Sequence, residues 1–303
     1  MNLGIWAVII WTVFGWVSNM LMKKVSKEFP DNYLALVFQY IAMAIVALIL
    51  GWLWAFYHGT AYIPSLSAIQ WILVVGVWIV GYIGILFLFR WYDYLCGGVA
   101  LVIANLATFL MYFINLALYP GQEAFSIEKI LLAIIFFIII AQFLLDQGSC
   151  PINHRNIINK YTLYPLGTAV CWAAYYVGNS YFIKSWMMSP VQVGMITESL
   201  ILVFALIWFA AMRWLTKGLF DIKKNMNKDK LSFFLIWLFN VVSVYLVYYW
   251  YQTNAANIVN VLKLFTIPFA AIFCRVFLKD RLTKKQTILL VIGFLSMVWF
   301  LYL

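Results

Sequence analysis

The chain has 303 residues, of which 66% are hydrophobic and only 10% are charged, and its mean hydropathy is +0.96. Soluble domains carry about 25% charged residues, so this composition cannot supply a water-exposed surface. We therefore expect a polytopic membrane protein embedded in the lipid bilayer. The formal net charge of +10 is interpreted as loop charge that sets orientation, and no nucleic-acid partner is expected.

Ten apolar stretches, each long enough to cross a bilayer as a helix, follow one another along the chain. Helix is the expected state, because every backbone polar group in lipid must be satisfied within its own segment. The predicted fold class is an all-α polytopic membrane protein with ten transmembrane helices. The predicted spans cover residues 3–22, 33–56, 70–91, 98–119, 128–146, 162–183, 191–213, 231–252, 256–277 and 286–303.

The last five spans repeat features of the first five. Trp11 and Lys23 have the same separation as Trp172 and Lys184. Three further matches keep the same order: Gln39 with Glu198, Trp91-Tyr92 with Trp250-Tyr251, and residues 123–126 with residues 280–283. A five-helix unit used twice inserts in opposite orientations, which predicts the 5+5 inverted repeat of a secondary transporter. Residues 1–146 would form the first five-helix repeat, 147–161 the loop between the repeats, and 162–303 the second repeat.

Basic residues gather on one side of the predicted spans. All but three of the 20 Lys and Arg residues follow odd-numbered spans, and the exceptions are Lys129, Lys184 and Lys263. The positive-inside rule predicts that these basic loops are cytoplasmic, which places both termini outside. We expect a multi-pass protein of the plasma membrane or the inner membrane.

Two charged residues, Glu198 and Lys263, lie deep inside predicted spans. A charge at a helix centre costs about 2.5–3.5 kcal/mol on insertion scales. Each lies about seven residues from the outer end of its span, or roughly 10 Å along a helix, so the two can meet. Three roles stay open: binding of substrate or a proton, a purely structural ion pair, and a Lys263 that extends to the interface.

Further polar and aromatic side chains complete the predicted substrate-binding set. Tyrosines and a tryptophan would supply aromatic walls, and amides would supply hydrogen-bond donors and acceptors. The alternatives are lipid-facing or packing aromatics and asparagines that join helices. The additional candidates are Tyr245, Tyr176, Tyr175, Trp11, Asn260, Asn257, Asn105 and Gln39.

No pattern for catalysis, metal binding or a cofactor is present in the sequence. The four cysteines have no paired spacing, and there are only two histidines, so neither a disulfide framework nor a metal site is predicted. Walker A, Gly-x-Ser-x-Gly and His-Glu-x-x-His motifs are absent. We do not expect an enzyme, and we expect no catalytic residues.

Residues 267–283, Ile-Pro-Phe-Ala-Ala-Ile-Phe-Cys-Arg-Val-Phe-Leu-Lys-Asp-Arg-Leu-Thr, precede a final apolar span. This arrangement resembles the ten-helix, EamA-like branch of the drug/metabolite transporter superfamily, with Lys279 and Asp280 in place of a glycine and a glutamate. Trp11, Ser18-Asn19 and Lys23-Lys24 are similar to the first helix of that family. The resemblance implies a 5+5 inverted repeat, a central cavity and metabolite transport, often amino-acid efflux. The same superfamily includes phosphosugar and nucleotide-sugar carriers, which often have a phosphate-binding lysine in the ninth helix. Lys263 resembles that lysine.

We therefore predict a secondary transporter that moves a small polar metabolite by alternating access. An amino acid or related zwitterion is favoured, with Lys263 binding a carboxylate or phosphate and Glu198 binding an amine or carrying a coupling proton. The alternative in the same class is a carrier or exchanger of phosphorylated or nucleotide-linked sugars. The alternative from another class is a membrane scaffold or sensor that transports nothing. The protein would act as a monomer or a homodimer.

Overall fold

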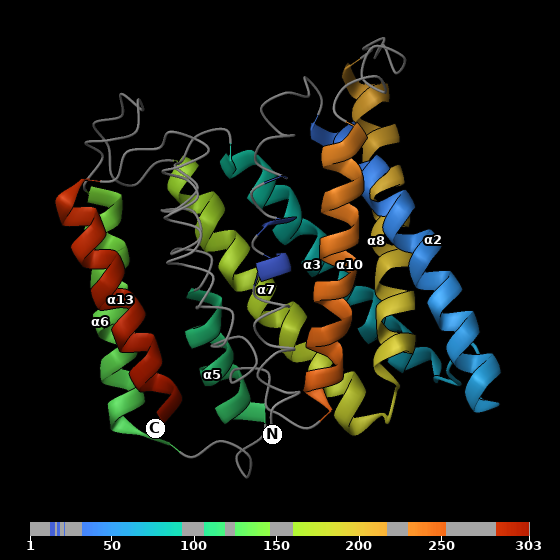
Figure 1. Cartoon of the computed structure of the whole chain (residues 1–303), viewed down its shortest axis with the longest axis horizontal. Coiled ribbons are helices and arrows are strands. Elements are labelled where there is room, and N and C mark those ends of the chain that lie inside the picture. The colour runs from blue at the N-terminus through green and yellow to red at the C-terminus, as the bar shows by residue number, and fades with distance from the viewer. Residues whose placement is uncertain are drawn as a thin grey trace. The chain divides into compact units, whose positions relative to one another are not determined.

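A computed structural model of the chain describes residues 13–15, 17–18, 21, 32–92, 106–118, 125–145, 160–216, 230–252 and 283–302. Every regular element within these ranges is a helix (Figure 1). The helices are α2 (Asn32–His58), α3 (Ala68–Tyr92), α5 (Leu106–Leu118), α6 (Ile127–Leu145), α7 (Lys160–Ser185), α8 (Pro190–Thr216), α10 (Lys230–Tyr251) and α13 (Lys284–Tyr302).

These helices coincide with predicted spans, and this confirms the all-helical class for the part of the chain that the structure describes. Within the described ranges, four stretches are long and apolar enough to cross a membrane: Val37–His58, Ala68–Leu88, Pro190–Trp214 and Phe234–Tyr251. The predicted ninth span, residues 256–277, lies outside the described residues. The total of ten spans and the 5+5 repeat stay predictions.

The chain divides into two compact units, and each draws on both halves of the sequence. Unit 1 comprises Met1–Tyr82 and Gly178–Thr253, and unit 2 comprises Ile83–Val177 and Asn254–Leu303.

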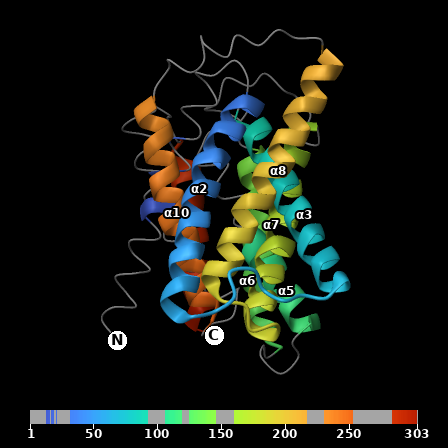
Figure 2. The ribbon, with the colours of Figure 1, turned by 90° about the vertical axis from the view of Figure 1, so that its right-hand side faces the viewer.

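Unit 1 is built around α2, α8 and α10. The contact between α2 and α8 is the most extensive, and α10 packs against both helices (Figures 1 and 2). Gly51 of α2 makes room for Met195 of α8, whose sulfur would lie 2.6 Å from a Cβ at position 51. Such small residues let membrane helices approach closely. The opposite face of α2 is apolar and exposed, as Trp52 and Tyr57 show at 57% and 82% exposure, which suits contact with lipid and its interface.

The described residues of the first predicted span also lie in unit 1, against α10. The rings of Phe14 and Phe239 have centroids 4.8 Å apart. The Ser18 hydroxyl donates to the Ile236 carbonyl at 3.4 Å. These contacts extend the helix cluster of unit 1 to a fourth segment of the chain.

Unit 2 contains α5, α6 and α13, and α6 runs beside α13 while it contacts α5 (Figure 1). At the start of α6 the Ser126 hydroxyl accepts a hydrogen bond from the Lys129 backbone N–H at 3.2 Å. The Ser126 N–H donates to the Tyr112 hydroxyl of α5 at 3.1 Å. The Lys129 ammonium lies 5.2 Å from the centre of the same tyrosine ring. A helix cap and a cation–π contact therefore fix this corner of unit 2.

Candidate functional site

Glu198 lies in the first third of α8 and is only 2% exposed. Its neighbours do not satisfy its carboxyl group, because the hydroxyls of Thr197 and Ser199 bond to their own helix. The Thr197 hydroxyl donates to the Val193 carbonyl at 2.6 Å, and the Ser199 hydroxyl donates to the Met195 carbonyl at 2.8 Å. Within the described residues, the buried Oε2 of Glu198 has no hydrogen-bond partner.

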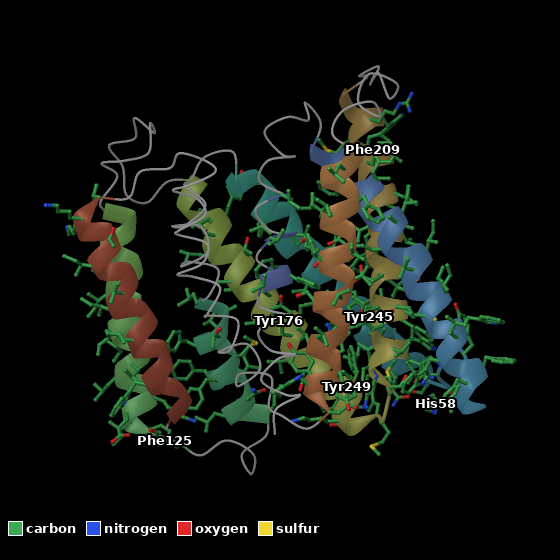
Figure 3. All side chains as sticks on the ribbon, in the orientation of Figure 1. His58, Phe125, Tyr176, Phe209, Tyr245 and Tyr249 are labelled. Carbon is green, nitrogen blue, oxygen red and sulfur yellow. The ribbon has the colours of Figure 1, made fainter. Side chains whose placement is uncertain are left out.

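Tyr245 of α10 lies beside this carboxyl group. Its hydroxyl is also buried and has no hydrogen-bond partner in the described part of the chain. Its ring packs against α8 at Gly194, four residues before Glu198. Figure 3 shows Tyr245 on α10, in the same unit as His58 at the end of α2. The site therefore combines a carboxyl group and a phenol from two packed helices.

Gly194 determines how closely Tyr245 approaches α8. It lies one helical turn before Glu198, so the two positions share a face of α8. A Cβ at position 194 would lie 2.7 Å from Cε1 and 3.1 Å from the hydroxyl oxygen of Tyr245. The phenol ring therefore occupies the space that any larger residue would fill, and Gly194 seats the ring next to the carboxyl group.

Tyr62 is a further candidate for this site that the sequence analysis did not name. It lies in the connection between α2 and α3, residues 59–67, and its hydroxyl donates to the Leu48 carbonyl of α2 at 3.1 Å. The connection thus folds back along α2 to within one helical turn of Gly51, where α2 packs against Met195 of α8. Two Ser-x-x-Gln motifs, at residues 67–70 and 189–192, are typical of helix starts. They mark the starts of α3 and α8, but they do not place Tyr62.

Gln39 belongs to a different polar cluster in unit 1. It is 3% exposed, and its side-chain amide donates to the Met43 sulfur at 3.8 Å. The amide of Asn240 donates to the same sulfur at 3.5 Å. This cluster lies in the first half of α2, far from the connection at residues 59–67 that follows the helix. Glu198 lies in the first half of α8, and the start of α8 contacts that connection.

Tyr175 and Tyr176 lie on α7 within unit 2, where Figure 3 labels Tyr176. The two rings form an edge contact with centroids 5.4 Å apart, and Tyr176 lies 6.2 Å from the Trp172 ring. Both tyrosines are half-buried. The structure thus brings together two predicted site residues and Trp172 in one aromatic cluster.

The other predicted site residues lie outside the described residues. The proposed meeting of Lys263 with Glu198 therefore stays a prediction. Among the described side chains, no group of three or more His, Cys, Asp or Glu residues could hold a metal ion. The predicted residues in question are Lys263, Asn260, Asn257, Asn105 and Trp11.

A third buried polar cluster in unit 1 was not predicted from the sequence. The Trp78 indole N–H donates to Oδ1 of Asn179 at 3.0 Å, and Nδ2 of Asn179 donates to the Tyr248 hydroxyl at 3.4 Å. Trp78 and Asn179 have no exposed surface, and Tyr248 is 1% exposed. Both ends of the Asn179 amide are satisfied, so this cluster joins α3, α7 and α10 in the way that amides join membrane helices.

Three comparisons with known proteins bear on this chain. A sequence model of the EamA-like transporter family matches residues 159–302. A comparison with curated proteins finds no match, whereas 28 chains of solved structures match. One of them, a crystal structure that is 13% identical, has a TM-score of 0.59 and covers 98% of this chain and 94% of its own. At this identity the likeness shows a shared fold and nothing about the cargo.

Proposed function

We propose that this chain, a member of the drug/metabolite transporter superfamily through its EamA-like segment, is a secondary transporter whose cargo carries a positively charged amine. Members of the EamA-like family are integral membrane transporters or permeases and not enzymes. The apolar helices of membrane-spanning length agree with this class. Cargo, mechanism and cellular membrane are the parts that we propose.

The observation that carries the proposal is a pair of buried polar atoms, Oε2 of Glu198 and the hydroxyl of Tyr245, that have no hydrogen-bond partner among the described residues. Most buried polar side-chain atoms in proteins have a hydrogen-bond partner, and exceptions call for an explanation. Burial of an unpaired carboxyl group costs stability, because the group loses its bonds to water. Intramembrane carboxyl groups usually line substrate or ion pathways. A ligand or a proton that arrives at this position would offset that cost.

The chemistry of the site favours a cationic amine over an anion. A carboxylate accepts hydrogen bonds from an ammonium group, and the phenol of Tyr245 can donate or accept beside it. A phosphorylated or nucleotide-linked sugar is disfavoured at Glu198, because two negative charges in a low dielectric repel each other. A zwitterionic amino acid would need a second, basic group for its carboxylate, and Lys263 is our candidate for that role.

We further propose that transport proceeds by alternating access, and that Glu198 carries a coupling proton when no cargo occupies the site. Basic residues gather in the loops after the odd-numbered spans, and the positive-inside rule then favours a cytoplasmic location for these loops and an outer location for both termini. Labelling tests this orientation: Cys150 in the loop at residues 147–161 should resist a membrane-impermeant thiol reagent in intact cells. Mass spectrometry should find the label on Cys150 only in inverted vesicles, and labelling from outside would reverse the orientation.

Flux through the purified protein in proteoliposomes tests the function. The vesicles are offered radiolabelled amino acids, polyamines and sugar phosphates in turn. For a transported amine, Glu198→Gln should lower the rate by about ten- to a hundredfold, which corresponds to one lost charge-assisted hydrogen bond. Glu128→Gln, at an exposed position of α6, is the matched control and should transport normally. Amine flux through Glu198→Gln at the wild-type rate would remove Glu198 from the site.

A further inference from the structure

The connection between α2 and α3 is anchored at both ends by local motifs. At its start, Gly59 adopts a left-handed conformation with φ of 60°, and the Thr60 N–H donates to the Ala55 carbonyl at 3.1 Å. This is the usual way in which a glycine ends a helix and turns the chain away. At its end, Ser67 begins α3. The segment between these anchors is largely exposed, so its position depends on few contacts.

Two glutamines at helix starts form a natural comparison. Gln70 and Gln192 each accept a hydrogen bond from a serine N–H three residues earlier, at 2.8 Å from Ser67 and 3.0 Å from Ser189. Each serine hydroxyl accepts the N–H of its glutamine in return, at 3.3 and 3.1 Å. These reciprocal pairs are capping boxes, and they account for the oxygen atoms of both glutamine side chains.

Gln192 makes one contact that goes beyond its capping box. Its Nε2 donates to the Ala61 carbonyl at 3.0 Å, across 131 positions of the chain. The contact ties the first turn of α8 to the exposed connection. The next residue, Tyr62, donates its hydroxyl to the Leu48 carbonyl of α2 at 3.1 Å. Leu48 lies one helical turn before Gly51, the position where α2 packs against Met195 of α8, three residues before Glu198. The tie therefore acts one residue away from a side chain that reaches the part of α2 facing the Glu198 region of α8.

We propose that Gln192 is a positioning residue of the Glu198 site: its side-chain amide holds residues 59–67 in place, so that Tyr62 closes the site at the end where α8 begins. The inference rests on the proposed role of Glu198 and Tyr245. In this arrangement Oε2 of Glu198 and the hydroxyl of Tyr245, which have no partner among the described residues, are shielded from water. Breaking the hydrogen bond between Gln192 and Ala61 releases the connection, and the site opens at this end.

Hydrogen bonds at exposed positions suit this task. The net contribution of each is small, since water competes for both partners. Two such bonds, from Gln192 to Ala61 and from Tyr62 to Leu48, hold the middle of the connection, so its closure is readily reversed, whereas a buried network would lock the connection permanently. The local motifs at Gly59 and Ser67 keep the two ends of the connection fixed while its middle moves.

Chemical access to Glu198 tests the proposal without knowledge of the cargo. A water-soluble carbodiimide activates an accessible carboxyl group, and glycine ethyl ester then forms a stable amide with it. The full-length protein in detergent is treated for increasing times, and fragment mass spectrometry gives the rate at Glu198. The informative variant is Gln192→Glu, which keeps the capping oxygen and loses the amide that reaches Ala61. Its new carboxyl group is distinguished from Glu198 in the fragments.

Gln192→Glu should raise the rate at Glu198 by about two- to tenfold, the Boltzmann factor of one net hydrogen bond. Gln70→Glu makes the same chemical change in the other capping box and should leave the rate unchanged. Tyr62→Ala removes the closing side chain and should raise the rate at least as much as Gln192→Glu. A wild-type rate in Gln192→Glu would overturn the proposal, and so would an equal rise in Gln70→Glu or a wild-type rate in Tyr62→Ala.

The result is separable from the proposed function. Loss of transport in Glu198→Gln together with unchanged access in Gln192→Glu would retain the site and reject the closure. Faster labelling in Gln192→Glu together with normal transport by Glu198→Gln would retain a mobile connection over a carboxyl group that carries no cargo. This second outcome would reject the positioning role, because nothing at the site would then need to be positioned.

Discussion

Two tyrosines of α10, three residues apart, differ in what surrounds their hydroxyl groups. Tyr248 accepts a hydrogen bond from Asn179, which in turn accepts one from Trp78. Tyr245 lies beside Glu198, and neither its hydroxyl nor Oε2 of Glu198 has a hydrogen-bond partner among the described residues. Both clusters are buried within unit 1.

The difference indicates that one helix contributes to a structural cluster through Tyr248 and to the candidate functional site through Tyr245. The two clusters share α10 and a similar apolar setting, so burial alone does not explain why only one of them is satisfied. A closed hydrogen-bond network stabilises the packing of helices and leaves no capacity for a ligand. An open cluster costs stability, and such costs in native proteins are typical of functional sites. The account therefore predicts opposite consequences when the two clusters are altered.

The largest expected loss of stability follows from Gly194→Ala. The added methyl group would overlap the Tyr245 ring, and overpacking of this kind costs about 1–3 kcal/mol. The free energy of unfolding is measured by detergent titration in mixed micelles. Gly76→Ala is the matched control, because a Cβ there meets nothing within 4 Å, and better helix propensity should leave it unchanged or slightly stabilised. Equal stability of the two variants would show that Gly194 does not seat the ring.

Asn179→Ala removes the central residue of the hydrogen-bonded cluster of Trp78, Asn179 and Tyr248. It leaves the Trp78 N–H without its acceptor and the Tyr248 hydroxyl without the Asn179 donor, so we expect a loss of about 1–2 kcal/mol, the range for polar contacts between membrane helices. Amine flux per folded molecule should stay at the wild-type value, because the cluster has no proposed role in transport. A double-mutant cycle with Trp78→Phe isolates the pair. A coupling energy near zero would contradict the assigned hydrogen bond.

The smallest effect is also the most direct comparison of the two tyrosines. Tyr248→Phe removes a hydroxyl with a partner and should cost about 0.5–1.5 kcal/mol. Tyr245→Phe removes a hydroxyl that has no hydrogen-bond partner among the described residues. It should be neutral or stabilising, because the cost of burying an unpaired hydroxyl is removed with it. Both variants change one oxygen atom on one helix, and the same unfolding titration compares them. A larger loss from Tyr245→Phe would mean that its hydroxyl has a structural partner in the rest of the chain.

The helices were predictable from the sequence because lipid leaves a long apolar segment only one way to satisfy its backbone. The segment at 191–213, for example, was predicted within a few residues of Pro190–Thr216. Glu198 was predicted as a site residue for a related reason: a carboxyl group in such a segment is costly and usually lines a substrate or ion pathway. Tyr245 was added to the predicted site by counting residues from the end of its span, since depth follows from helix rise.

The partners within each cluster were not predictable. Depth along a helix does not determine which face meets which neighbour, so nothing in the sequence joined Asn179 to Trp78. Tyr62 was missed because it lies in a connection, where a tyrosine has no periodic pattern to place it. The Ser-x-x-Gln motif at 189–192 is typical of a helix start, but the second hydrogen bond of Gln192 depends on a segment 131 positions away.

Modification of Glu198 inside working proteoliposomes tests the central claim most directly. Dicyclohexylcarbodiimide is apolar and converts a protonated buried carboxyl group into a stable N-acylurea. Mass spectrometry gives the modified fraction at Glu198, and amine flux is measured in the same vesicles. The account predicts that flux falls in proportion to the modified fraction, and that the transported amine slows the modification. Complete modification of Glu198 with undiminished flux would contradict it.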